Sequence, residues 1–86
     1  MEEKQLLQAG EDAHALLNDP AFNRVVDALV DSTFQAFVNT NPDEAQERER
    51  AYHHYRGLTD VVSTLKQQVE VRDQILANKK KAQDHE

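Results

Sequence analysis

The chain has 86 residues and a net charge of −6, with 38% hydrophobic and 30% charged residues. A chain this short buries only about 60% of the surface that its unfolded form exposes, so we expect one domain with a thin core. Because it contains no cysteine, it has no disulfide framework, thiolate metal site or cysteine nucleophile.

The sequence carries no signal for a membrane or for export. It lacks a run of about 18 apolar residues, the length that would span a bilayer. Its first residues are acidic, whereas a signal peptide begins with basic residues followed by an apolar stretch. We therefore expect a soluble, intracellular protein that makes no membrane contact.

Acidic residues are concentrated in the first half of the chain. Residues 1–44 contain two basic and nine acidic residues, whereas residues 45–86 contain eight basic and seven acidic residues. An acidic surface repels nucleic acid, because nonspecific affinity for phosphate depends on Lys and Arg. Nucleic-acid binding is therefore disfavoured except through the run Lys79, Lys80 and Lys81, which is more typical of a solvated helix end.

Two prolines preceded by Asp or Asn divide the chain into three expected helices. The first covers residues 3–17, with leucines and alanines at spacings of three and four, and Gly10 weakens it. The second covers residues 20–38, because Pro20 suits the first position of a helix and the preceding Asp caps the free amides. It carries eight large apolar residues, so we expect it to meet neighbours on two sides.

A long third helix is expected over residues 42–78, with Pro42 in its first position and a polar tail over residues 79–86. Its positions 48, 51, 55, 58, 62, 65, 69, 72 and 76 alternate spacings of three and four, and seven of these nine are apolar. This pattern is typical of a coiled-coil seam. Gly57 lowers helix stability by about 1 kcal/mol relative to Ala, and indicates either a close approach of another backbone or a bend.

Together these elements predict an all-α fold, an antiparallel helical hairpin. Residues 20–38 fold back along the first half of the long helix, and residues 3–17 lie beside its second half. One hairpin leaves a side of each helix uncovered, so we expect a homodimer with a coiled-coil-like bundle, or a higher cyclic oligomer. The expected interface residues are large apolar side chains of the second and third helices: Phe22, Val26, Leu29, Phe34, Phe37, Tyr55, Leu58, Val62, Leu65, Val69 and Leu76.

No constellation of residues predicts catalysis, a metal or a cofactor. Of the histidines His14, His53, His54 and His85, only His53 lies four residues from a carboxylate, Glu49, and no third ligand accompanies them. No serine or threonine lies in a nucleophile motif, and the two glycines are 47 positions apart, too far to form a phosphate loop. We therefore expect no enzyme activity, no bound metal and no cofactor.

Three stretches of the chain resemble a known group of proteins. They read Ala-His-Ala-Leu-Leu-Asn-Asp-Pro-Ala-Phe, then Asn-Thr-Asn-Pro-Asp-Glu, then Ala-Tyr-His-His-Tyr-Arg-Gly-Leu, within residues 13–70. In this order they resemble small helical proteins of tailed bacteriophages that are encoded among the head and packaging genes. The resemblance implies a phage setting, in the cytoplasm of an infected bacterium or in a virion, and it implies no catalytic residues.

The function expected from these features is a non-enzymatic, oligomeric interaction protein that assists virion assembly or DNA packaging through contacts with another phage protein. One alternative is an acidic inhibitor of a host enzyme or defence factor, in which the carboxylates of the first half mimic DNA phosphate. The other is a small DNA-binding packaging subunit that uses its lysine run and Arg56.

Overall fold

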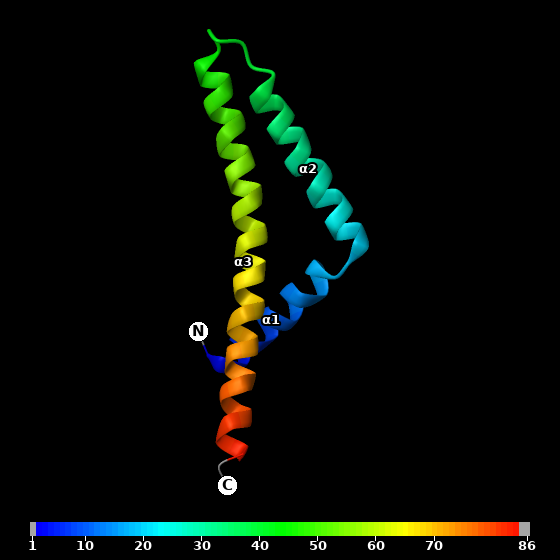
Figure 1. Cartoon of the computed structure of the whole chain (residues 1–86), viewed down its shortest axis with the longest axis vertical. Helices are drawn as coiled ribbons and strands as arrows, with labels where there is room; N and C mark the ends of the chain where they lie inside the picture. The colour runs from blue at the N-terminus through cyan, green and yellow to red at the C-terminus, as the bar shows by residue number, and fades with distance from the viewer. Residues whose placement is uncertain (1, 85–86) are drawn as a thin grey trace. The chain divides into compact units, whose positions relative to one another are not determined.

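The computed structural model describes residues 2–84, and every regular element in that range is a helix. In chain order these are α1 (Glu3–Leu17), α2 (Pro20–Val38) and α3 (Ala45–Asp84) (Figure 1). The all-α prediction is confirmed. The bounds of α1 and α2 coincide with those expected from the sequence.

Polar groups at both ends of α1 satisfy its free backbone amides and carbonyls. At its start the Glu2 amide donates a hydrogen bond to Gln5 Oε1 at 3.3 Å. At its end the Asn18 amide and the Asn18 side chain both donate to the His14 carbonyl, at 3.1 and 2.9 Å. A helix end left without such partners would be costly, so these residues fix where α1 begins and ends.

A turn over residues 41–44 separates α2 from α3, and this corrects the expected start of the third helix. The Glu44 amide donates to the Asn41 carbonyl at 2.9 Å, and the Glu44 side chain accepts a hydrogen bond from the Asn41 amide at 3.1 Å. Pro42 therefore occupies the second position of a four-residue turn rather than the first position of the helix. Both positions suit proline, because each requires a φ close to the fixed φ of proline and neither requires the backbone N–H that proline lacks.

The third helix also continues beyond its expected end, to Asp84 rather than residue 78. Lysine, alanine and glutamine are good helix formers, and cations near the C-terminus of a helix interact favourably with its dipole. Residues 79–84 of the expected polar tail are therefore helical, whereas residues 85 and 86 lie outside the described residues.

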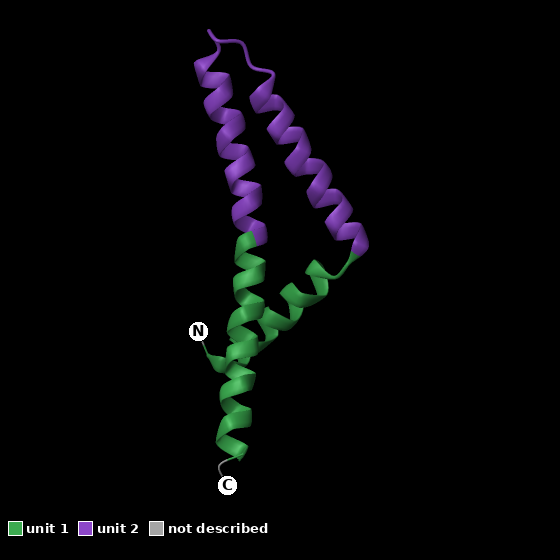
Figure 2. Ribbon diagram, in the orientation of Figure 1, with its two compact units in different colours: residues 1–19, 63–86 green, residues 20–62 purple. Residues whose placement is uncertain are grey.

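The chain forms two compact units, and α3 contributes to both (Figure 2). In unit 1, α1 packs against the part of α3 that begins at Ser63; in unit 2, α2 packs against the part that ends at Val62. Within unit 2 the two helices lie closest near the turn and diverge toward Pro20 (Figure 1). The predicted pairing of the first two helices with the two halves of the long helix is confirmed.

The core of each unit is very small. Among the described residues, the buried apolar side chains are Ala13, which is 1% exposed, and Ala51, which is 8% exposed. No large side chain of residues 2–84 is fully buried. The helices therefore meet through small residues, and most of their large apolar side chains remain partly accessible.

Candidate interaction surface

Four aromatic side chains gather on one side of unit 2, near the turn. Phe34 and Phe37 come from α2, and Tyr52 and Tyr55 come from α3. The ring centroids of Phe34 and Tyr55 are 6.0 Å apart and those of Phe37 and Tyr52 are 6.1 Å apart, in tilted pairs. These distances suit favourable edge-to-face contacts. As the residue number rises along α2 it falls along α3, so the two helices are antiparallel.

We call these four residues the aromatic face. They line a hollow of about 210 Å³. Phe34 and Tyr52 remain 46% and 43% exposed, so the rings are in contact with each other and still open to solvent. Arg56 lies beside the face and donates a hydrogen bond to the Tyr52 hydroxyl at 3.4 Å.

The opposite side of unit 2 near the turn has a different chemistry. An open groove of about 520 Å³ lies there, lined by Ser32, Thr33, Ala36, Asn39, Thr40, Glu44, Glu47, Arg50, Ala51 and His54. Its hydroxyl, amide and charged groups are readily solvated. Near the turn, unit 2 is therefore a layer of two helices with one aromatic side and one polar side, as expected when one side is covered by another protein surface.

Unit 1 brings two helices together at a glycine. A Cβ atom added at Gly10 would overlap Cβ of Arg72 and lie 2.9 Å from the Gln68 carbonyl oxygen, so α1 and α3 approach each other closely here. Gly57, by contrast, has no such neighbour within 4 Å. The close approach considered at Gly57 therefore does not occur within the described chain. It occurs at Gly10, which the sequence analysis treated only as a weak point of its helix.

Ion pairs surround this contact in unit 1. Arg72 lies 3.2 Å from Glu11 of α1 and 2.8 Å from its neighbour Asp73, and Lys79 lies 2.7 Å from Glu3. The hydrogen bonds to Asp73 raise the pKa of Arg72 above its ordinary value, partial burial opposes this, and Glu11 raises it further. A raised pKa adds stability below the unfolded-state pKa, so Arg72 stays charged and contributes fully at ordinary pH.

We expect Arg72→Met to destabilise unit 1 in a salt-dependent way. The aliphatic part of the side chain is retained, while the contacts with Glu11 and Asp73 are lost. The midpoint of urea unfolding should fall at 50 mM NaCl, and the deficit should shrink at 500 mM NaCl because salt screens the ion pairs of the unmodified protein. Lys66→Met, which removes an exposed charge, is the control. An equal deficit at both salt concentrations would show that the ion pairs contribute nothing.

The expected interface residues differ in how far the chain itself covers them. Leu29, Phe34 and Leu76 are exposed. The remaining eight are partly buried within the chain: Phe22, Val26, Phe37, Tyr55, Leu58, Val62, Leu65 and Val69. The structure brings Phe34, Phe37 and Tyr55 together in the aromatic face, whereas Leu65, Val69 and Leu76 belong to unit 1.

Sequence reasoning missed part of this surface. Tyr52 completes the aromatic face but lies outside the expected seam, and Val61 is 55% exposed although its neighbour Val62 was selected. The three-residue spacing between Tyr52 and Tyr55, matched by that between Phe34 and Phe37, was the signal that could have identified Tyr52. Two such pairs on antiparallel helices fall side by side.

The described residues offer no other site with clear chemistry. No group of three or more His, Asp or Glu side chains within residues 2–84 could hold a metal ion. The rings of His53 and Tyr52 are tilted against each other, with their centroids 5.8 Å apart. His85 lies outside the described residues. None of the helices in residues 2–84 combines the length and the apolar character needed to cross a membrane.

Comparison with known protein families, with curated proteins and with solved structures finds no match for this chain. The resemblance to small phage proteins therefore stays a hypothesis, and the argument for function depends on the chemistry of the surface.

Proposed function

We propose that the chain is a non-enzymatic interaction protein that acts as an oligomer. One observation carries the proposal: eight large apolar side chains of the described residues are between 40% and 58% exposed, while none of the large ones is fully buried. Exposed apolar side chains are common singly, but four aromatic rings around one hollow form a continuous patch that another protein surface would cover.

The phage setting is the part of the proposal that depends on the resemblance alone. In that setting the protein would assist virion assembly or DNA packaging by binding another phage protein. The two alternatives receive less support from unit 1, because Glu3 and Glu11 are ion-paired with Lys79 and Arg72. The ion pairs partly neutralise the charge with which Glu3 and Glu11 would mimic DNA phosphate. They also partly neutralise the charge with which Lys79 would bind DNA phosphate.

Light scattering coupled to size exclusion tests the oligomer. We expect a mass of two or more chains of 9.8 kDa at micromolar concentration. A folded, sharply melting species with the mass of one chain would overturn the proposal.

A pull-down from infected cells with tagged protein then tests the phage setting, and we expect it to recover a head or packaging protein. Recovery of a basic host enzyme would instead favour the acidic inhibitor.

A further inference from the structure

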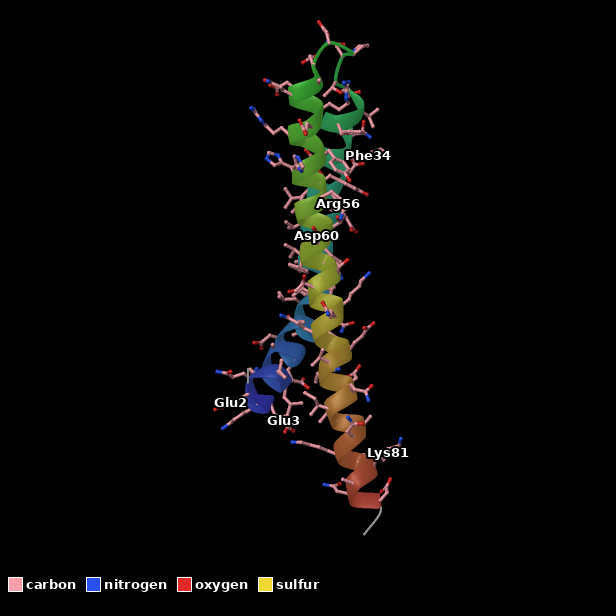
Figure 3. All side chains as sticks on the ribbon, turned by 90° about the vertical axis from the view of Figure 1, so that its left-hand side faces the viewer. Glu2, Glu3, Phe34, Arg56, Asp60 and Lys81 are labelled. Atoms are coloured by element: carbon pink, nitrogen blue, oxygen red, sulfur yellow. The ribbon has the colours of Figure 1, made fainter. Side chains whose placement is uncertain are left out.

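In unit 1, α1 runs antiparallel to α3 along the second half of the predicted seam. Figure 3 shows Glu3 at the beginning of α1, beside the last turns of α3 that carry Lys81. Glu3 pairs with Lys79, and Gly10, seven residues further along α1, lies against Arg72, seven residues earlier in α3. Continuing this register places three more residues of α1 level with apolar residues of the seam: Leu6 with Leu76, Ala13 with Val69 and Leu17 with Leu65.

This contact between α1 and α3 is close but buries little apolar surface. The buried residues of α1 are Gly10 and Ala13, the two smallest residue types. The leucines around them stay partly accessible, and Leu16 and Leu76 are 40% and 46% exposed. Because hydrophobic stabilisation scales with the apolar area removed from water, the apolar part of this attachment is weak.

Ion pairs supply a second part of the attachment. The Arg72 side chain is only 12% exposed and lies 3.2 Å from Glu11, and Lys79 lies 2.7 Å from Glu3. When α1 leaves, Arg72 keeps its neighbour Asp73 on α3 but loses Glu11. Both acids of α1 are more than half exposed, so salt reaches these pairs. A pair of this kind changes an equilibrium by up to about fivefold, and added salt screens it.

The hydrogen bonds of unit 1 allow α1 to leave α3 without disrupting another helix. Those that cap α1 join residues 2–18 to one another, and those of α3 lie within one continuous helix of 40 residues. A helix of 15 residues is only marginally stable in water, so detached α1 unfolds. Its amide groups and buried side chains then become accessible, while α3 remains helical.

A different kind of contact holds unit 2 together near the turn. Its helices meet there through the tilted ring pairs of Phe34 with Tyr55 and of Phe37 with Tyr52. Salt does not screen contacts between aromatic rings as it screens ion pairs. Ionic strength therefore acts selectively on the attachment of α1 in unit 1.

We propose that α1 is a strap over the second half of the seam that rising ionic strength releases. At low ionic strength α1 covers this part of α3, and added salt increases the fraction of chains in which α1 is detached while unit 2 stays folded. Detachment opens three residues that were expected at an interface: Leu65, Val69 and Leu76. The inference concerns unit 1 and goes beyond the proposed oligomer, whose aromatic face lies in unit 2.

A thiol-labelling experiment on the full chain tests the release. Because the chain contains no cysteine, one introduced cysteine is a unique probe. Ala13→Cys places the probe in the buried contact of unit 1, and Ala51→Cys places it in that of unit 2. With N-ethylmaleimide, an uncharged reagent, labelling of Ala13→Cys should accelerate about threefold to tenfold between 50 and 500 mM NaCl, and that of Ala51→Cys less than about twofold. Equal responses of the two probes would overturn the inference.

A charge substitution tests whether the ion pairs hold the strap. In the Ala13→Cys chain, Glu11→Gln removes the pair with Arg72 while keeping the size of the side chain. Labelling at 50 mM NaCl should become about threefold faster, and its response to salt should shrink. Glu70→Gln, at an exposed acid of the same unit, is the matched control and should leave the rate unchanged. The same rate for both variants would contradict the proposal.

Hydrogen exchange of the unmodified protein covers the case in which an introduced cysteine itself loosens the contact. Amides of residues 3–17 should exchange about threefold to tenfold faster at 500 mM than at 50 mM NaCl, whereas those of residues 20–38 should change little. An equal acceleration in both helices would mean that the chain opens as one unit, and the strap would be ruled out. A monomeric protein with the selective response would overturn the proposed function and support this inference.

Discussion

Adding one methyl group at each of the two glycines should change stability in opposite directions. We expect Gly10→Ala to lower the free energy of unfolding by about 1–2 kcal/mol. The new Cβ overlaps Cβ of Arg72, and overpacking of this kind costs about 1–3 kcal/mol. The better helix propensity of alanine offsets part of that cost, by up to about 1 kcal/mol.

Position 57 supplies the matched control for this experiment. A Cβ at Gly57 meets nothing within 4 Å, so only helix propensity changes, and Gly57→Ala should raise the free energy of unfolding by about 0.5–1 kcal/mol. Urea unfolding followed by circular dichroism, with all proteins at one fixed concentration, measures both changes. If Gly10→Ala stabilises the protein as much as Gly57→Ala does, α1 is not seated on α3 at this contact.

The atom that opposes the new methyl group makes the cost hard to avoid. Cβ of Arg72 is fixed by the backbone of α3, so it cannot rotate away as the end of a flexible side chain could. Relief requires a shift of one helix against the other, which would also disturb the contact of Arg72 with Glu11. Gly10 is therefore a packing residue. Its low helix propensity destabilises α1, but its missing side chain allows α1 and α3 to lie in close contact.

The two glycines also show where sequence reasoning stops. Periodicity identified the helices and their apolar sides, and together with the capped proline at the start of α2 it gave the bounds of α1 and α2 correctly. Whether a glycine faces a neighbour depends on how each helix is rotated against the next, which composition and spacing do not determine. The sequence thus predicted a cost at both glycines and placed a possible close approach at Gly57, whereas the close approach lies at Gly10.

The predicted start of the third helix was wrong for a different reason. Proline is equally suited to the first helical position and to the second position of a turn, so Pro42 alone cannot distinguish them. The two hydrogen bonds between Asn41 and Glu44 place Pro42 in a turn and not in the helix. Glutamate three residues after asparagine is a pattern that a sequence can show, but its meaning depends on the backbone conformation that it helps to form.

The candidate site was predictable in part. Phe34, Phe37 and Tyr55 follow from apolar periodicity, because they lie on the sides of their helices that face each other. Tyr52 does not follow from it, since the heptad pattern excludes its position.

The melting temperature should depend strongly on protein concentration. Ala13 and Ala51 are the buried apolar side chains of the described residues, and two small cores of this kind give little stability to an isolated chain. If association supplies the remaining burial, unfolding and dissociation are one process, and mass action stabilises the folded state as concentration rises. The same apolar side chains then serve both the fold and the interface.

The size of this effect follows from the association equilibrium. A tenfold increase in concentration is worth about 1.4 kcal/mol per dimer. For a cooperative unit of the size of this dimer, 1 kcal/mol shifts the melting temperature by about 2–4 °C. We therefore expect an increase of about 3–6 °C for each tenfold rise in concentration, measured by circular dichroism between 2 and 200 μM.

Variants of the aromatic face sharpen the interpretation of that measurement. Phe34→Ser should melt at a lower temperature than the unmodified protein at every concentration, because dissociation is easier, while Val61→Ser should follow the unmodified protein. A melting temperature that is constant over the hundredfold range, with a sharp transition, would mean that each chain folds alone. The exposed aromatic rings would then contribute nothing to folding, and the proposed oligomer would be overturned.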